Sequence, residues 1–559
     1  MQFLNLVVFL SLYFLLFLSV SGWGSISNKI FKIDVKNFPL NLLLGIILLT
    51  FISYISIFFI KHDSIFNILI HSLGVIFFVK NFKSFKIDKS YYFIILAISI
   101  ALIVSKNHDD FPFYHFQQAF NFSTNKFQIG LANLDFSYAH NSSLLFLNSL
   151  FYFPVVKYYL YNAPNLIFYT SLILLFYQSL NKAFLKIDIY KVEFVFLLLT
   201  IVYCLVKFSR LSEFGTDLTG QILVFYLFYL FLNFDYVVKN FNLIHIILVF
   251  LLTLKTYFIT YFLLVFVLMH MIGYKLYFKK LFQQKFLVAF TFCFLLVFFV
   301  TNFMTSGCII YPIAQFCFEN FSWSLTVREV QEYNIWYEKW AKGIAGTNYL
   351  LDESENLLSN LNWLNNWFLN YFFNKVLDNI LLISFIILIL FTMIKIKNYE
   401  FKNENTLKNK NFLLVYLPIF LIFLFWFFKH PTLRYGGYAP LFITIVFPIV
   451  YYLSKYEISQ NFKQIYSILV ISSFVIFISK NIYRINKEFL RDDFYKFTNF
   501  PYYKLEENVE YFKINLNDNI SVSYPVKGTC WNSPPPCSTT KNITAKKKYN
   551  FIIFAKKNQ

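Results

Sequence analysis

Long apolar runs, separated by short polar or basic stretches, are the dominant pattern along this chain. A helix needs about 20 apolar residues to cross a bilayer, because every backbone amide in lipid must be hydrogen-bonded within its own segment. The runs therefore predict about 14 transmembrane helices. They cover residues 2–20, 39–60, 65–79, 91–105, 163–180, 192–206, 219–233, 241–254, 256–272, 286–304, 377–393, 412–428, 436–453 and 465–478.

Two of these predictions have an alternative. The first run resembles a signal peptide, but it lacks a basic start and a clear small-residue cleavage site, which favours a retained span. The stretch 241–272 is interrupted only by Lys255, so it is either one long span or two short ones.

Three segments interrupt or follow the apolar runs. In residues 106–162, the spacing of Phe, Leu and Tyr predicts short amphipathic helices lying on the membrane surface. Residues 305–375 contain "NWLNNWF", which is typical of interfacial helices with a Trp belt. Residues 481–559 combine turn signals ("SPPPC") with short β-like runs such as "YNFIIFA". The predicted fold is an all-α polytopic bundle over residues 1–480 with two large external loops and a small C-terminal soluble α+β appendage.

Composition supports a membrane protein. Of the 559 residues, 58% are hydrophobic and 14% are charged, whereas ordinary soluble domains are about 45–50% apolar and about 25% charged. The mean hydropathy is +0.56. Such an excess of apolar surface requires lipid as its solvent.

The net charge of +20 is interpreted as a topology signal. Short basic loops stay on the cytoplasmic side, and lysines gather in the loops 80–89, 275–285 and 395–410. With the spans above, these three loops lie on one side, and segments 106–162, 305–375 and 481–559 lie on the other. The expected location is the bacterial inner membrane, with these segments in the periplasm, and nucleic acid is not an expected partner.

The cysteines agree with this orientation. Cys530 and Cys537 lie in "GTCWNSPPPCS", and Cys308 and Cys317 lie in "SGCIIYPIAQFCF". Both pairs are in segments predicted to be external, where disulfides persist. Zinc is disfavoured because no histidines accompany either pair at finger-like spacing. The sequence predicts two disulfides, with four unrelated thiols as the alternative.

Acidic residues begin the first loop. Asp109 and Asp110 lie in "KNHDDFPFYHFQQ", directly after an apolar run and shortly before His115. Acids at this position can be solvated helix caps. At a lipid–water boundary, a carboxylate can also take a proton from a hydroxyl of a water-soluble partner while a lipid-linked partner enters from the bilayer.

Cations form a second candidate site. "FFKHPTLRYGGYAP" places Lys429, His430 and Arg434 at a span end predicted to be external, where cations are not expected. Such a group next to two glycines is suited to bind a phosphate or pyrophosphate. The alternative is that these cations extend toward lipid headgroups. Lys255 is costly inside an apolar run unless it is paired. Asp217, in "VKFSRLSEFGTDLTG", lies in a short external loop that is interpreted as a salt-bridged turn, with a functional role as the alternative.

These features together resemble the multi-span type C glycosyltransferases, which take a sugar from a polyprenyl-phosphate carrier. More narrowly, "DDFPFYHFQQAFNF", "SGCIIYPI", "RYGGYAPL" and "GTCWNSPPPCS" look like the motifs of a poorly characterised bacterial family of such proteins. In the simpler members, the acidic first loop follows the first span. Here about four spans precede it, so the resemblance requires additional N-terminal helices.

The resemblance implies a function and roles for residues. Asp110, or Asp109 beside it, would be the general base on the acceptor hydroxyl, and Arg434, with Lys429, would hold the carrier phosphate. His430, His115 and Lys255 are the other candidate substrate-binding residues. The implied partners are a polyprenyl-phosphate sugar donor, membrane lipids, and a glycan, lipid or protein acceptor. No cofactor is predicted with certainty, and a divalent metal is compatible with the resemblance.

Other functions make different predictions. A flippase or polymerase of lipid-linked glycans would also use external cations, and a transporter would place its ionisable residues nearer the middle of the membrane. If Asp110 and Arg434 serve one sugar transfer, we expect their side-chain tips to lie roughly 6–12 Å apart, with the sugar between them.

Overall fold

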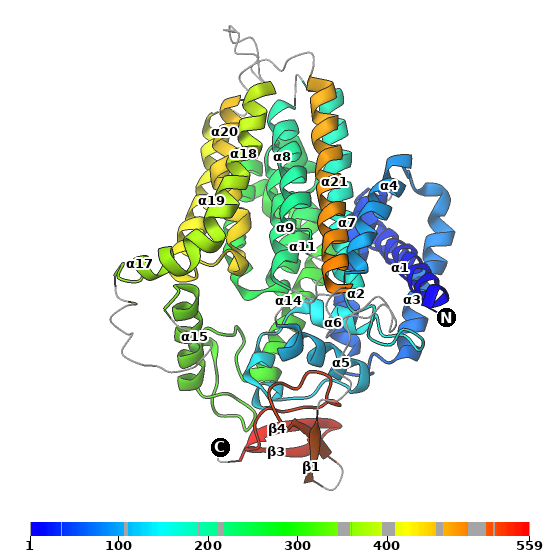
Figure 1. The fold of residues 1–559 in the computed structure, drawn as a ribbon, viewed down its shortest axis with the longest axis vertical. Coiled ribbons are helices and arrows are strands. Elements are labelled where there is room, and N and C mark those ends of the chain that lie inside the picture. The colour runs from blue at the N-terminus through cyan, green and yellow to red at the C-terminus, as the bar shows by residue number, and fades with distance from the viewer. Residues whose placement is uncertain are drawn as a thin grey trace.

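The fold is mostly helical, as the computed structural model in Figure 1 shows. Its helices stand roughly along one axis, and a layer of short helices and β-hairpins covers one end of them. The structure describes residues 2–34, 36–104, 110–187, 190–210, 216–344, 358, 360–393, 409–453, 462–489, 510–517 and 520–557.

The first half of the chain contributes helices to the bundle and also forms the first loop. Its α-helices are α1 (Gln2–Ile30), α2 (Phe38–Ser56), α3 (Ser64–Asn81), α4 (Lys89–Ser99), α5 (Phe116–Thr124), α6 (Ser143–Ser149), α7 (Ala163–Leu185), α8 (Lys191–Lys207), α9 (Asp217–Phe231), α10 (Phe234–Lys239), α11 (Phe241–Leu254) and α12 (Leu263–Ile272). Shorter 3₁₀ or π turns are η1 (Phe82–Ser84), η2 (Ile100–Leu102), η3 (Phe111–His115), η4 (Leu131–Asn133), η5 (Phe136–Ala139) and η6 (Thr256–Phe262).

The second half completes the bundle and adds four strands. Its elements are α13 (Tyr274–Gln283), α14 (Lys285–Ser306), η7 (Ala314–Phe316), α15 (Val327–Ala341), α17 (Leu364–Trp367), η8 (Phe368–Val376), α18 (Leu377–Met393), α19 (Asn409–Lys429), η9 (Leu433–Gly437), α20 (Tyr438–Leu453) and α21 (Phe462–Phe489). The strands are β1 (Tyr511–Asn517), β2 (Ile520–Pro525), β3 (Ile543–Lys548) and β4 (Phe551–Lys556).

Nine helices within the described residues are long and apolar enough to cross a membrane. The number is ten if the segments 256–272 and 274–283, bent by 109° at Gly273, form one broken span. The other four expected runs coincide with α4, α8, α9 and α11, which are shorter. The positions of the apolar runs are therefore confirmed, and the count of about 14 spans stays a prediction.

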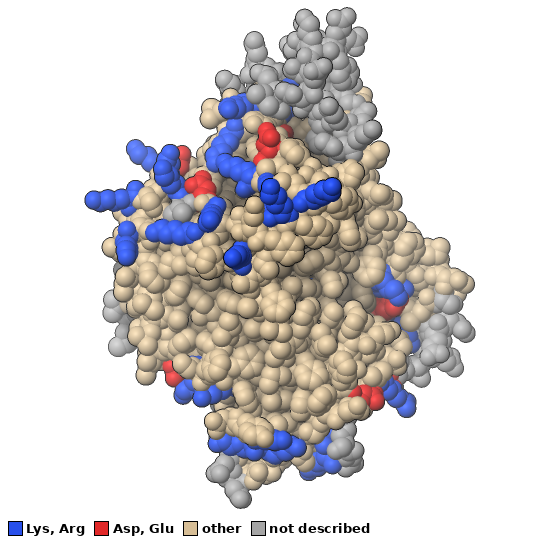
Figure 2. All heavy atoms as spheres, turned by 180° about the vertical axis from the view of Figure 1, so that it is seen from behind, with Lys and Arg blue, Asp and Glu red and all other residues tan. Residues whose placement is uncertain are grey.

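Charged side chains avoid the middle of the bundle. From behind, Figure 2 shows a broad band with few charges, with Lys and Arg gathered along its upper edge and again near its lower end. A bundle embedded in lipid requires this distribution, because an unpaired charge in hydrocarbon is costly. The surface thus agrees with an integral membrane protein.

Helices α1, α2 and α3 approach one another closely at glycines. A Cβ at Gly22 of α1 would overlap the carbonyl oxygen of Gly74 in α3, and one at Gly24 would overlap the backbone of Asn41 in α2. Small residues let helix backbones pack in lipid, where dispersion contacts drive association. The first apolar run is therefore packed as a helix of the bundle.

Much of the first loop is buried. Every residue of α6 is buried, and Phe116 and Phe122 of α5 have no exposed surface. The prediction of interfacial amphipathic helices in 106–162 was wrong, because other segments cover these apolar faces. The amide of Gly130 donates to the carbonyl of Met304, and Ile129 pairs with β4.

The C-terminal segment packs on both loops. Strands β1–β2 and β3–β4 form two antiparallel hairpins. The described residues 510–517 and 520–557 contain strands and turns but no helix, so the expected α+β appendage is β-structured there. Ile129 donates to the carbonyl of Ile552 and accepts from the amide of Phe554, both at 2.9 Å. Lys556 forms an ion pair with Glu329 of α15.

The Trp residues of the second loop are buried. Trp363 and Trp367 are 1% and 3% exposed and share a small core with Trp426 and Leu433. The indole N–H of Trp367 donates to the carbonyl of Pro431 at 2.8 Å. The predicted Trp belt was therefore wrong for this pair, because these rings support the segment between α19 and α20.

Both predicted disulfides are confirmed. The sulfur atoms of Cys308 and Cys317 are 2.07 Å apart, and those of Cys530 and Cys537 are 2.12 Å apart. The first bridge closes a turn after α14, and the second closes a loop between β2 and β3.

Candidate functional site

Arg434 joins two carboxylates from distant parts of the chain. Its Nε donates to Oδ2 of Asp217 at 2.6 Å, and its Nη2 donates to Oδ2 of Asp110. The ammonium of Lys255 lies 3.1 Å from Oδ1 of Asp217. We call Asp110, Asp217, Lys255 and Arg434 the charge cluster.

Each member of the charge cluster stands at the end of a helix. Asp217 is the first residue of α9, and Lys255 directly follows α11. Arg434 lies in η9, immediately before α20, and Asp110 directly precedes η3. The apolar helices therefore bring the four charges together near one end of the bundle, where charge is less costly than at its middle.

The two carboxylates differ in exposure. The side chain of Asp217 is 3% exposed, whereas that of Asp110 is 25% exposed. A buried carboxylate must be paired, and Asp217 has two cations beside it and the positive end of α9 behind it. Asp217 is thus a counter-ion for Arg434 and Lys255, and Asp110 is the carboxylate that a partner molecule can reach.

Gln221 fixes the backbone that carries Arg434. It lies in α9, one turn beyond Asp217, and it is fully buried. Its Nε2 donates to the carbonyls of Leu433 and Arg434 at 3.2 and 3.1 Å, and its Oε1 accepts from the amide of Tyr438 at 2.7 Å. Helix α9 therefore holds both the side chain and the backbone of Arg434.

Aromatic residues complete the support of this segment. The hydroxyl of Tyr371 accepts from the amide of Leu433 at 2.7 Å, and the indole of Trp426 donates to the carbonyl of Thr432 at 2.8 Å. Gly436 has φ of +87°, and a Cβ there would overlap the ring of Tyr257. Only glycine fits this position without strain.

Lys429, His430 and Arg434 do not form one cationic group. The ammonium of Lys429 lies 3.8 Å from Oε2 of Glu338 in α15, and the Lys429 side chain is 57% exposed. Burial lowers the pKa of His430 to about 4, so its ring is neutral near pH 7. Of the three predicted cations, Arg434 alone joins the charge cluster.

The remaining sequence candidates have different positions. Lys255 is paired, as a lysine in an apolar run requires. His115 is fully buried in the first loop, with its ring centroid 4.2 Å from that of Tyr114. Asp109 lies outside the described residues.

Asp110 and Arg434 do share one site, but the expected separation of 6–12 Å was wrong. Their side chains are in direct contact. The estimate assumed a sugar between the two groups. Without one, opposite charges at a partly buried site attract each other into contact.

Sequence reasoning missed Asp217 and Gln221. It assigned Asp217 to a turn with nearby cations, whereas the partners of Asp217 come from α11 and η9. A usable signal was present, because Lys255 interrupts an apolar run and needs a carboxylate, and Asp217 opens another apolar run. Within the described ranges, no three His, Cys, Asp or Glu side chains gather into a metal-binding set.

His140 joins the first loop to α15. Its Nε2 lies 2.5 Å from the hydroxyl of Tyr337, and its ring packs on that of Tyr311. Burial, and secondarily the charge of Lys255, lower the pKa of His140 to about 3. The imidazole is therefore neutral in the folded protein at physiological pH.

Acid should weaken this contact. The folded pKa of His140 lies below its unfolded value, so the unfolded chain takes up a proton first as pH falls below about 6.5. We expect a loss of at most about 1.4 kcal/mol per pH unit between about pH 6.5 and pH 3, and no change above that window. In thermal unfolding between pH 7.5 and pH 4, His140→Gln should lose less stability with acid than the unmodified protein.

The matched control is His270→Gln, at an exposed position on α12. An equal acid loss in both variants would contradict the assignment.

The comparisons with known proteins identify a family for this chain but do not indicate an activity. No curated protein and no solved structure matches this chain significantly. The matching family model is described as "Domain of unknown function (DUF8201)", and it covers residues 6–441, from α1 to the start of α20. The match includes all four members of the charge cluster and ends before the C-terminal hairpins. The chain therefore belongs to the DUF8201 family.

Proposed function

We propose that the protein is an integral membrane glycosyltransferase that moves a sugar from a polyprenyl-phosphate donor to a glycan, lipid or protein acceptor. The reaction takes place at the end of the bundle that carries the charge cluster, on the periplasmic face of a bacterial inner membrane. The predicted 14-span topology, with both large loops and the C-terminal segment on that face, is part of the proposal.

The charge cluster supplies the two groups that this reaction needs. The acceptor hydroxyl oxygen attacks C1 of the sugar, and its proton passes to the carboxylate of Asp110. The bond between C1 and the phosphate oxygen breaks, and its electron pair stays on the polyprenyl phosphate. The guanidinium of Arg434 neutralises this leaving group.

The ion pair between Asp110 and Arg434 implies an order in which the two substrates are engaged. A donor phosphate is a stronger partner for a guanidinium than a single carboxylate oxygen, so it competes with Asp110 for Arg434. Asp217 keeps Arg434 oriented during this exchange through the Nε contact. Donor binding thereby releases Asp110 as a base, and the acceptor is activated after the donor is bound.

One observation carries the proposal: a partly exposed carboxylate, Asp110, and an arginine, Arg434, meet at the ends of the helices. A transporter would need such groups nearer the middle of the bundle. A flippase or polymerase of lipid-linked glycans would also use Arg434, but a flippase would have no need for a base beside it.

Activity should depend on Arg434. In purified protein in nanodiscs, Arg434→Ala should lower kcat/KM for a polyprenyl-phosphate sugar by about 30- to 1,000-fold, the equivalent of about 2–4 kcal/mol. The control is Arg328→Ala, because Arg328 is 87% exposed on α15 and, among the described residues, pairs with Glu332 of its own helix. Equal activity of the two variants would contradict the phosphate role.

Cell-surface glycans distinguish the alternatives. Mass spectrometry of cells without the gene should show glycans that lack one sugar, together with unused donor lipid. Intact glycans would exclude the transferase. Donor can also be supplied on the external face of cells that lack the gene. If this supply restores the missing sugar, the result favours a flippase.

A further inference from the structure

The loop closed by the second disulfide packs against Phe111, the residue that follows Asp110. We call residues 530–537 the disulfide loop. The ring of Trp531 is 5.4 Å from that of Phe111, edge to face, and 6.1 Å from that of Phe116. Phe111 and Phe116 have no exposed surface. Trp531 therefore holds the residue that directly follows Asp110.

The backbone of the disulfide loop is bound to the same helix. The side-chain amide of Gln117 donates to the carbonyls of Trp531 and Ser533 at 2.8 and 2.6 Å. On the other side, the amide of Ser523 in β2 donates to the carbonyl of Pro536 at 2.9 Å. The hydroxyl of Ser538, just past the loop, donates to the carbonyl of Leu134 at 2.7 Å. The loop is thus fixed to the first loop of the bundle at several points.

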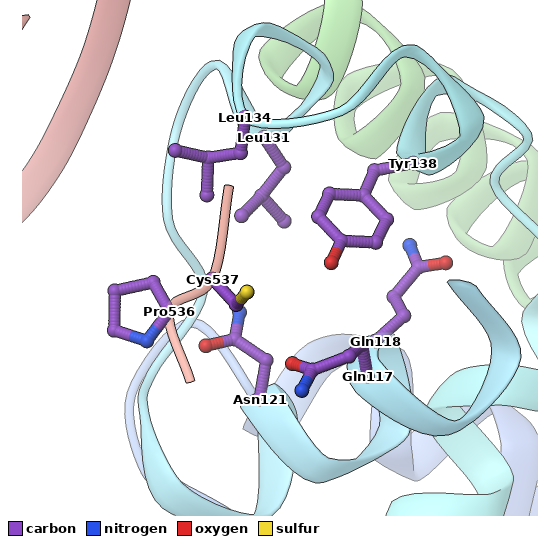
Figure 3. Close-up of a pocket in the computed structure, with 8 residues that line it drawn as sticks. All are labelled: Gln117, Gln118, Asn121, Leu131, Leu134, Tyr138, Pro536 and Cys537. Atoms are coloured by element: carbon purple, nitrogen blue, oxygen red, sulfur yellow. The ribbon is translucent and has the colours of Figure 1, made fainter. Parts of the chain in front are cut away.

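The contact is less complete near Cys537. Figure 3 shows a small cavity between α5, η4, η5 and the disulfide loop, lined among others by Gln118, Tyr138 and Pro536. Its volume of about 10 Å³ is barely enough for one water molecule. Gln118 is 3% exposed, and its amide has no hydrogen-bond partner among the described residues. The disulfide loop is therefore attached to α5 through Trp531 and Gln117.

The turn that carries Asp110 depends on Phe111. The carbonyl of Asp110 accepts from the amides of Tyr114 and His115 at 3.1 and 3.4 Å, which makes η3 a π turn. π turns are rare and occur mostly as single turns, frequently at functional sites. With Phe111 packed on Trp531, the rotation of η3 is fixed, and Asp110 is directed to Arg434.

We propose that Trp531 is a positioning residue for Asp110, and that the Cys530–Cys537 bridge makes this positioning sensitive to reduction. The C-terminal segment, which lies outside the family match, thereby becomes part of the site. The inference rests on the proposed function only for what Asp110 does. The geometric part stands without it.

Hydrogen exchange tests the geometry without substrate. In the purified full chain, Trp531→Ala should speed amide exchange in residues 111–116 by tenfold or more and leave α14 unchanged. Trp531→Phe should keep most of the protection. The control is Tyr549→Ala, since Tyr549 is 84% exposed in the turn between β3 and β4. Unchanged exchange in Trp531→Ala would overturn the proposal.

Two adjacent glutamines offer a matched pair. Gln117→Met should also speed exchange in 111–116, because it removes the donor to the carbonyls of Trp531 and Ser533. Gln118→Met should have little effect, because the buried amide it removes has no hydrogen-bond partner in the described part of the chain. Equal effects of the two substitutions would contradict the role of Gln117.

The disulfides give a redox test with its own control. The double substitution Cys530→Ser, Cys537→Ser should reproduce the faster exchange, and Cys308→Ser, Cys317→Ser should not. If the protein transfers sugar, the first double variant should lower kcat at least tenfold and leave KM for the donor nearly unchanged, because Arg434 is not displaced. If the first double variant exchanges faster but the unmodified protein transfers no sugar, the proposed function is rejected and the positioning role of Trp531 stands. Normal exchange in the first double variant would overturn the redox part.

Discussion

Asp110→Asn protein is expected to bind the polyprenyl-phosphate donor and to transfer no measurable sugar. The amide keeps the shape of the carboxylate but cannot accept the acceptor proton, and loss of a general base typically costs about 10²–10⁴-fold in rate. Donor affinity should not fall, because the amide no longer competes with phosphate for Arg434. Turnover and donor binding, both measured in nanodiscs, separate the two effects.

The control for this variant is Asp63→Asn. Asp63 caps α3 near the same end of the bundle, accepting from the amide of Phe66 at 3.1 Å, and asparagine also serves as a cap. We expect its turnover to be normal. Full turnover in purified Asp110→Asn protein would count against Asp110 as the base, and full turnover after both Asp109 and Asp110 are replaced would reject the mechanism.

Asp217→Asn is expected to destabilise the fold rather than to stop catalysis selectively. The substitution leaves Lys255, which is 14% exposed, without its counter-ion, and it removes one of the two carboxylates that hold Arg434. Removal of one partner of a buried pair typically costs about 3–5 kcal/mol. A lower midpoint of thermal unfolding in detergent should report this loss, and Asp110→Asn should show a smaller one, because Asp110 is more exposed.

A second substitution checks the cause. In Asp217→Asn, Lys255→Gln protein the unpaired ammonium is gone, and we expect part of the lost stability to return. If the double variant is less stable than Asp217→Asn by the full cost of Lys255→Gln alone, the two residues do not interact, and the assignment of Asp217 as a counter-ion is wrong.

The helices of the bundle were predictable from local sequence. The run 286–304 became α14, with bounds that differ by one or two residues, and 163–180 became the start of α7. Lipid makes this possible, because backbone hydrogen bonds must close within each segment, so local composition decides the element. The number of spans was less predictable, since α9 and α11 are too short to be assigned by length alone.

The site was predictable only in part. Asp110 and Arg434 each stand out against their surroundings, one as an acid at a span end and the other as an unexpected cation, and they do meet. Asp217 does not stand out, because cations adjacent in sequence offered a nearer explanation. Its actual partners depend on how α9, α11 and η9 are arranged in space, which no local pattern reports.

The errors in the loops have the same origin. The apolar spacing in residues 106–162 is compatible with a helix on a membrane and with one under protein. What decides between them is the cover, and that cover includes β4 and the disulfide loop. A local pattern can show that a face is apolar, but it cannot show what covers the face.

The contacts between the first loop and β4 also bear on how the protein is made. Asn133 donates to the carbonyl of Phe554, which lies 421 positions later. At a synthesis rate of about 5–20 residues per second, the first loop waits roughly 20–80 s for this partner. During that time its apolar faces lack their final cover, and Phe111 has no Trp531 to pack against. We therefore expect that, in a nascent chain arrested before the disulfide loop, the helices are already in the bilayer while the first loop remains accessible to proteases and chaperones.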